Sequence, residues 1–85
     1  MAGHIIDVEK VRESETEVEY EFNLRWQPEK YRFTIDKKTG EVEFDTAVRK
    51  DRVQLAWAAV WKRAGRPDAP IPPETVWPET ATHIG

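Results

Sequence analysis

The amino-acid sequence predicts an α+β fold, in which a three- or four-stranded antiparallel meander carries one C-terminal helix on its apolar face and a Pro-rich extended tail follows. Apolar and polar residues alternate through residues 17–26, 31–35 and 41–44, which is the period of a half-buried strand. From Val53 the apolar residues recur with the spacing of one helix face. Five of the six prolines then fall in residues 67–85, where they exclude regular helix and central strand.

Length and composition describe one small globular domain with an extension. The chain has 85 residues, of which 39% are hydrophobic and 11% aromatic, too many for a fully disordered chain. A chain of this length buries a core that is only just large enough to support folding alone. We therefore expect a single meander-plus-helix domain over residues 1–66 and a Pro-rich C-terminal extension over residues 67–85.

The N-terminal run of residues 4–11 is predicted to be an edge strand. It is rich in Ile and Val, and a short polar link joins it to the next alternating segment. Its register is ambiguous. Ile6 and Val8 would share one face of the strand, whereas Ile5 and Val11 would share the other.

The two hairpins that follow predict a register for the sheet. Apolar residues must lie opposite apolar residues, because a one-residue slip would turn a whole strand over. The turn that contains Pro28 then sets Trp26 opposite Tyr31, Leu24 opposite Phe33 and Phe22 opposite Ile35. The loop at residues 37–40 sets Ile35 opposite Val42 and Phe33 opposite Phe44. The aromatic residues of this face, Trp26 among them, are expected in the core.

A helix is predicted from about residues 46–51 to residue 64. Its apolar stripe consists of Val53, Ala56, Trp57, Val60, Trp61 and Ala64. Gly65 is typical of the position just past a helix end. Asp51 is one candidate N-cap, and Asp45 or Thr46 is the alternative.

The Pro-rich extension carries apolar residues that a solvated linker would not need, namely Ile71, Val76 and Trp77. One helix is also narrow for the wide aromatic face of the predicted sheet. We therefore predict that residues 70–78 lie against the domain or against a partner subunit, with Trp77 as the anchor of the tail. A disordered tail and a peptide offered to another protein are the two alternatives.

The residue types that enzyme and metal sites require are scarce. The chain has no Cys, and its only serine, Ser14, has no histidine near it in the sequence. His4 and His83 lie near the chain ends, and the four glycines are too scattered to form a phosphate-binding loop. We therefore predict no enzyme activity, no catalytic residue, no cofactor and no metal site.

The hydropathy pattern argues against a membrane partner. No apolar run approaches the length that spans a bilayer, and charge appears too early in the chain for a signal peptide. The absence of Cys fits a reducing compartment. The sequence therefore predicts a soluble cytoplasmic protein.

Charge is distributed unevenly along the chain. Residues 1–48 hold seven Lys or Arg and twelve Asp or Glu, residues 49–66 hold six basic residues and one acid, and residues 67–85 hold three acids and no base. Segments that compensate each other within the fold are one interpretation. Two faces that meet two different kinds of partner are the other.

Two charged sets are the candidate interaction surfaces. The outer face of the predicted sheet carries the acidic set, Glu19, Glu21, Asp36, Glu41 and Glu43, and the same register sets Arg25 opposite Arg32. Three of these acids, Glu21, Asp36 and Glu41, are predicted to form one row. Either Lys37 and Lys38 screen that row, or it is kept for a basic protein surface, an Arg-rich peptide or a metal ion. The helix ends carry the basic set, Arg49, Lys50, Arg52, Lys62, Arg63 and Arg66.

These observations predict a small non-catalytic protein-interaction or accessory and regulatory protein. A protein partner is expected, and a homodimer is one form that the interaction could take. The alternative is a nucleic-acid-associated protein that uses the basic ends of the helix. Against this alternative, the outer sheet face carries Glu where a base-stacking platform would need Phe or Tyr.

Overall fold

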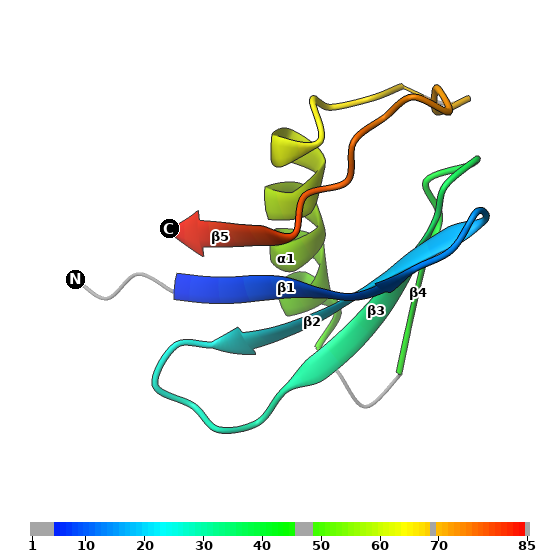
Figure 1. Ribbon diagram of the computed structural model, residues 1–85. Coiled ribbons are helices and arrows are strands. Elements are labelled where there is room, and N and C mark those ends of the chain that lie inside the picture. Colours follow the sequence, from blue (N-terminus) through cyan, green and yellow to red (C-terminus); the bar gives the residue numbers. More distant parts are fainter. Residues whose placement is uncertain (1–4, 46–48, 69, 85) are drawn as a thin grey trace.

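The computed structural model describes residues 5–45, 49–68 and 70–84. These residues form β1 (Ile5–Glu13), β2 (Glu17–Leu24), β3 (Tyr31–Asp36), β4 (Val42–Phe44), α1 (Lys50–Arg63) and β5 (Thr80–Ile84). The strands make one antiparallel sheet in the order β4-β3-β2-β1-β5, and α1 crosses one of its faces (Figure 1). The α+β class and the antiparallel sheet are confirmed. The described residues nevertheless form five strands in place of three or four, and a strand follows the helix.

The alternating pattern of β2 positions its residues as expected, but the strand ends earlier than predicted. Every second residue from Val18 to Leu24 is buried. The chain then turns, because the Gln27 N–H donates to the Leu24 carbonyl at 3.0 Å and Trp26 adopts a left-handed φ of 74°. The side chain of Trp26 is 81% exposed. The expectation that Trp26 extends the strand into the core is therefore wrong.

This early turn shifts the pairing of β2 with β3. The observed pairs are Val18 with Ile35, Tyr20 with Phe33, and Phe22 with Tyr31, so the predicted pairing of Phe22 with Ile35 is wrong by four residues. The apolar side chains still face the core, since an even shift preserves the side of the sheet on which each residue lies. The pairing of β3 with β4 is confirmed: Ile35 lies opposite Val42 and Phe33 opposite Phe44.

Strand β1 lies inside the sheet, so the expectation of an N-terminal edge strand is wrong. It pairs with β2 on one side and with β5 on the other. Ile6 and Val8 face the core, and the register shifts between Lys10 and Arg12, which leaves Val11 in a bulge and 41% exposed. A bulge adds one residue and therefore exchanges the two faces of the strand. The bulge therefore accounts for the position of Val11 alone, since Ile5 precedes it and lies on the face opposite Ile6 and Val8.

Helix α1 begins and ends within the predicted limits. Arg49 is the N-cap, with an extended backbone and no capping side-chain hydrogen bond, and Asp51 lies in the first turn. Asp51 and Asp45 are therefore not caps, and Thr46 lies outside the described residues. Beyond the helix, Gly65 has a φ of 93°, and the Arg66 N–H donates to the Trp61 carbonyl at 2.9 Å, which closes the helix end. No helix of the described residues is long and apolar enough to cross a membrane.

The apolar face of the sheet is covered by two segments. Helix α1 lies over β1 and β5 and contributes Val53, Ala56, Ala59 and Val60 to the core. The Pro-rich segment covers a further part with Ile71 and Trp77, and its Pro78 carbonyl accepts a hydrogen bond from the Tyr20 hydroxyl at 2.8 Å. Figure 1 shows this segment leading from the end of α1 back to β5. The described residues of the predicted extension, residues 67–85, thus supply part of the core and one strand.

Gly40 marks a close approach between the β3–β4 loop and the helix. It has a φ of 80°, and a Cβ built on it would come within 3.1 Å of the Trp61 ring. The same loop accepts a hydrogen bond at the Lys38 carbonyl from the Ile71 N–H, at 3.2 Å. The loop, the helix and the Pro-rich segment are therefore held together at this point.

Candidate functional site

The acidic set is spread over the open face of the sheet. Glu21 lies opposite Arg32, Asp36 lies opposite Glu17, and Glu19 and Glu43 flank Thr34. Asp36 and Glu41 are neighbours, with the Asp36 N–H donating to the Glu41 carbonyl at 2.8 Å. The predicted row of Glu21, Asp36 and Glu41 is wrong, because the four-residue shift of β2 moves Glu21 away from the other two acids.

Basic side chains on the same face pair with two members of the acidic set, Glu19 and Glu21. Arg12 contacts Glu17 at 2.7 Å and Glu19 at 3.1 Å. Arg32 contacts Glu21 at 3.2 Å, and Lys30 approaches the same carboxylate at 3.7 Å. Because these pairs are exposed to solvent, each contributes little to stability. Glu41 and Glu43 make no ion pair with another described residue.

Two further predictions for this face concern arginines and lysines. Arg25 does not lie opposite Arg32 as predicted. Arg25 pairs instead with Asp7 on β1, and Arg32 pairs with Glu21. Lys37 does reach a carboxylate, but the partner is Glu13 on β1. The cations that screen the acidic set therefore come mainly from neighbouring strands.

Asp36 has a structural role in the turn after β3. Its Oδ1 accepts hydrogen bonds from the N–H groups of Lys38 at 2.7 Å and Thr39 at 2.9 Å. These backbone hydrogen bonds lower the pKa of Asp36. Its carboxylate is thus committed to the loop.

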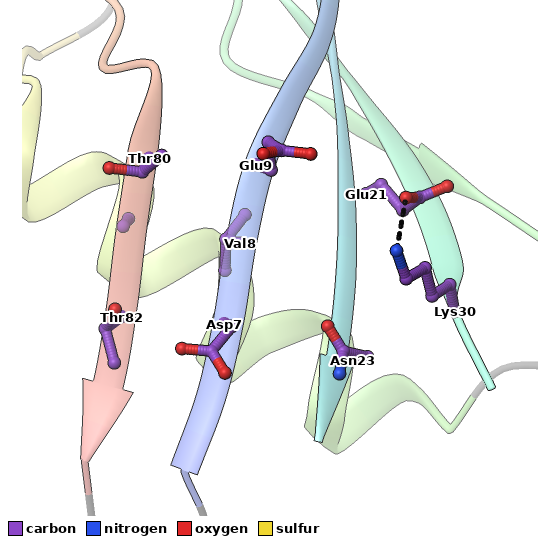
Figure 2. A pocket seen from close by; sticks show the side chains of 9 residues that line it. Asp7, Val8, Glu9, Glu21, Asn23, Lys30, Thr80 and Thr82 are labelled. Carbon is purple, nitrogen blue, oxygen red and sulfur yellow. Dashed lines mark ion pairs between the residues drawn. The ribbon is translucent and has the colours of Figure 1, made fainter. Parts of the chain in front are cut away.

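A hollow of about 260 Å³ lies on the open face where β5, β1 and β2 run side by side (Figure 2). Its polar lining consists of Asp7, Glu9, Glu21, Asn23, Lys30, Thr80 and Thr82. Glu9 lies opposite Glu21 and makes no ion pair with another described residue. The described residues contain no group of three or more His, Cys, Asp or Glu that could hold a metal ion. The alternating pattern does not predict this hollow, because one of its walls belongs to β5.

The Asp7–Arg25 pair makes two contacts between β1 and the residue that follows β2. Arg25 Nη2 lies 2.8 Å from Asp7 Oδ1, and Arg25 Nε lies 3.1 Å from Asp7 Oδ2. The hydrogen bonds from Arg25 lower the pKa of Asp7, against the opposing effect of partial burial, and the charge of Arg25 lowers it further. The folded state therefore binds this proton less readily than the unfolded state. The stabilisation is present above about pH 4 and is lost as the pH falls through the folded-state pKa.

Arg25→Gln is therefore expected to raise the pKa of Asp7 toward its ordinary value of 3.8. The free energy of unfolding of the variant should also decrease less than that of the wild type as the pH falls below about 4. NMR titration of the carboxyl carbons and denaturant unfolding at several pH values would measure both effects. Arg32→Gln is the matched control, since Arg32 pairs with Glu21 on the same face. Equal Asp7 titration in the two variants would contradict this assignment.

The basic set does not form one surface. Arg49, Lys50 and Arg52 lie at the start of α1, and Lys62, Arg63 and Arg66 lie at its end. A helix of 14 residues is roughly 20 Å long, so the two groups are well separated. Arg49 pairs with Asp51 at 3.0 Å, and the other five make no ion pair with another described residue.

Trp77, the predicted tail anchor, lies against the helix. It is 5% exposed, and its ring centroid lies 5.8 Å from that of Trp61. Its burial therefore holds the Pro-rich segment against the domain. Beside it, a second pocket of about 490 Å³ lies between the loops, and Ile71, Pro72 and Pro73 contribute to its lining.

A groove lies between α1 and the outer edge of β5, and we call it the α1–β5 groove. It measures about 460 Å³ and is lined by Trp57, Ala58, Ala59, Trp61, Lys62, Arg66, Asp68, Thr82, His83 and Ile84. Trp57 and Trp61 are half-buried and stack with ring centroids 5.1 Å apart. The Nε1 of Trp57 is shielded from solvent and finds no hydrogen-bond partner among the described residues. Helical spacing places both Trp residues on the apolar stripe of α1. They form the wall of a groove only because β5 lies beside them.

The groups considered for catalysis stay apart in the described residues. Ser14 lies in the β1–β2 turn, where its Oγ accepts hydrogen bonds from the N–H groups of Thr16 at 3.3 Å and Glu17 at 3.2 Å. His83 lies in β5 on the wall of the α1–β5 groove, and His4 lies outside the described residues. The hydroxyl of Ser14 therefore stabilises the turn between β1 and β2.

Comparison with protein-family models, with curated proteins and with solved structures found no match to this chain. The chain's own geometry is therefore the basis for a proposal about function. The α1–β5 groove combines an apolar wall, basic side chains and a strand at the edge of the sheet.

Proposed function

We propose that this protein is a small non-catalytic protein-interaction or accessory protein whose contact surface is the α1–β5 groove. One observation carries the proposal: β5 is the last strand of the sheet, and an aromatic groove runs beside it. A sheet edge offers unpaired N–H and C=O groups, which makes it a template for another chain. Proteins commonly protect such edges with charges, Pro or bulges. The sequence of β5, Thr-Ala-Thr-His-Ile, contains none of these devices.

The composition of the groove also supports binding in place of catalysis. Its wall consists of large apolar rings, with charged groups from Lys62, Arg66 and Asp68. Aromatic residues and arginine are enriched where proteins bind one another. Ile84 adds an apolar side chain that is 76% exposed in the free protein.

The proposal predicts that a change at the edge of β5 abolishes partner capture. Wild-type protein and Thr82→Pro would be used as paired baits in a lysate of the native host. A partner that the wild type retains should be lost by Thr82→Pro, because Pro removes the N–H through which the edge pairs. Circular dichroism and thermal unfolding would verify that the variant stays folded. A partner retained equally by both baits would contradict the groove as the contact surface.

Nucleic-acid binding provides the competing outcome. It would appear as an affinity for single- or double-stranded nucleic acid that decreases steeply with salt concentration. It would also weaken on charge reversal of Lys50 and Arg52, which lie at the opposite end of α1 from the groove. Such a result would support the nucleic-acid alternative over protein interaction.

A further inference from the structure

The pairing of β5 with β1 determines which of its backbone groups face outward. The Lys10 N–H donates to the Glu79 carbonyl at 2.8 Å, and Lys10 and Glu79 continue the β1–β5 register. In an antiparallel ladder the residues that exchange hydrogen bonds with a neighbouring strand alternate with residues that do not. Ala81 and His83 therefore bond toward β1. The N–H and C=O groups of Thr80, Thr82 and Ile84 point away from the sheet, into the space beside the edge.

Helix α1 extends beyond this edge. Figure 1 shows the last turns of α1 continuing past β5, and Trp57, Ala58 and Trp61 from these turns line the groove together with Thr82 and Ile84. A strand added beside β5 would thus lie under the overhanging helix. Its alternate side chains, opposite Ala81 and His83, would contact the two Trp rings. Apolar side chains suit these positions.

The charge of the groove indicates which charged side chains a bound segment should carry. Lys62 and Arg66 line it and make no ion pair with another described residue, whereas Asp68 is the single carboxylate of the lining. The groove is therefore positive overall. A bound segment that carries Asp or Glu would place its carboxylates near the two basic side chains.

A second copy of this chain is a poorer occupant. Residues 80–84 contain no acid, so a two-fold pairing of β5 with its own copy would bring no carboxylate of that strand toward Lys62 and Arg66. The same pairing would place both helices on one face of the joined sheet, with the basic side chains of both grooves on that face. Charge complementarity therefore favours a strand of different composition.

Resting on the proposed function, we propose that the α1–β5 groove binds an extended segment of a partner protein, which pairs with the outer edge of β5 and carries apolar and acidic side chains. The segment adds a sixth strand to the sheet. Its apolar residues pack on Trp57 and Trp61, and its carboxylates face Lys62 and Arg66. In this mode of recognition, hydrogen bonds of the main chain provide affinity, and contacts of the alternate side chains provide specificity.

The test uses a display library of random peptides as the probe and the full chain as the target. Enriched peptides should alternate apolar with acidic residues, and their binding should be lost in Thr82→Pro. The double variant Lys62→Glu/Arg66→Glu should weaken these peptides by about tenfold or more, because two favourable charge contacts become repulsive. Lys50→Glu is the matched control, since it reverses an exposed charge on the same helix outside the groove, and it should leave binding unchanged.

Three results would overturn the proposal. Peptides that bind with no acidic preference, or that ignore the charge reversal, would contradict the stated chemistry. A wild-type protein that is a dimer by light scattering, and that Thr82→Pro converts to a monomer, would identify a second copy as the occupant. A library that yields no peptide dependent on Thr82 would exclude an extended ligand. In each case the paired-bait experiment still decides separately whether the protein binds a partner through this edge.

Discussion

A chain that ends at Gly65 is expected to be unfolded at room temperature. This truncation removes β5, so that β1 loses one of its two neighbouring strands, and it removes the buried side chains of Ile71, Trp77 and Ala81. Full burial of one large apolar side chain is worth about 1.5–3 kcal/mol, whereas a domain of this size has a total stability of roughly 4–13 kcal/mol. The lost burial and the lost strand pairing together approach that total. Circular dichroism and size-exclusion chromatography would measure the outcome.

A second truncation separates the two contributions. A chain that ends at Pro78 keeps Ile71, Trp77 and the carbonyl that accepts the Tyr20 hydrogen bond, but it lacks β5. We expect this chain to be less stable than the full chain and more stable than the chain that ends at Gly65. It should therefore unfold at a lower temperature than the full chain, or fold only at low temperature. A chain ending at Gly65 that melts like the full chain would show that residues 67–85 contribute no stability.

Trp77→Ala is expected to lower the free energy of unfolding by about 3–5 kcal/mol, the usual cost of removing a large aromatic side chain from a core. Trp77 is almost completely buried against Trp61, and it lies next to Pro78, whose carbonyl accepts the Tyr20 hydrogen bond. Removing the ring opens a cavity beneath the Pro-rich segment. Urea unfolding, followed by far-ultraviolet circular dichroism, would give the change in stability.

Trp26→Ala is the matched control for this experiment. It removes the same side chain from the turn between β2 and β3, where the ring is exposed to solvent. The expected change is within about 0.5 kcal/mol, as for surface substitutions in general. Equal destabilisation by the two variants would show that burial of Trp77 does not hold the segment in place.

The contrast between these two tryptophans illustrates the limits of a periodic pattern. Trp26 continues the alternation of β2, and the alternation alone does not distinguish it from Leu24. Its exposure follows from a turn that begins at the Leu24 carbonyl, and the same turn shifts the pairing with β3 by four residues. Glu19, Glu21 and Glu43 consequently lie on the outer face, but the ion-pair partners of the acidic set are different from those expected.

The sequence by itself determined the features that depend on neighbours along the chain. Alternation identified which side chains of β2 and β3 face the core, and the short loop at residues 37–40 determined the register of β3 with β4. Helical spacing located α1 within the predicted limits. These features are local, because side-chain direction repeats every two residues in a strand and every 3.6 residues in a helix.

Only the tertiary structure decided the arrangement of β5 and the groove beside it. Residues 80–84 are a short segment after a run of prolines, with two threonines and a histidine, and no periodic signal marks them as a strand. They become one because β1, more than 70 residues earlier, presents an edge with which they pair. Long-range pairing depends on a strand edge that is distant in the sequence, and the residues of the short segment do not by themselves encode that edge. The α1–β5 groove arises from the same pairing, since its two walls meet only in the folded chain.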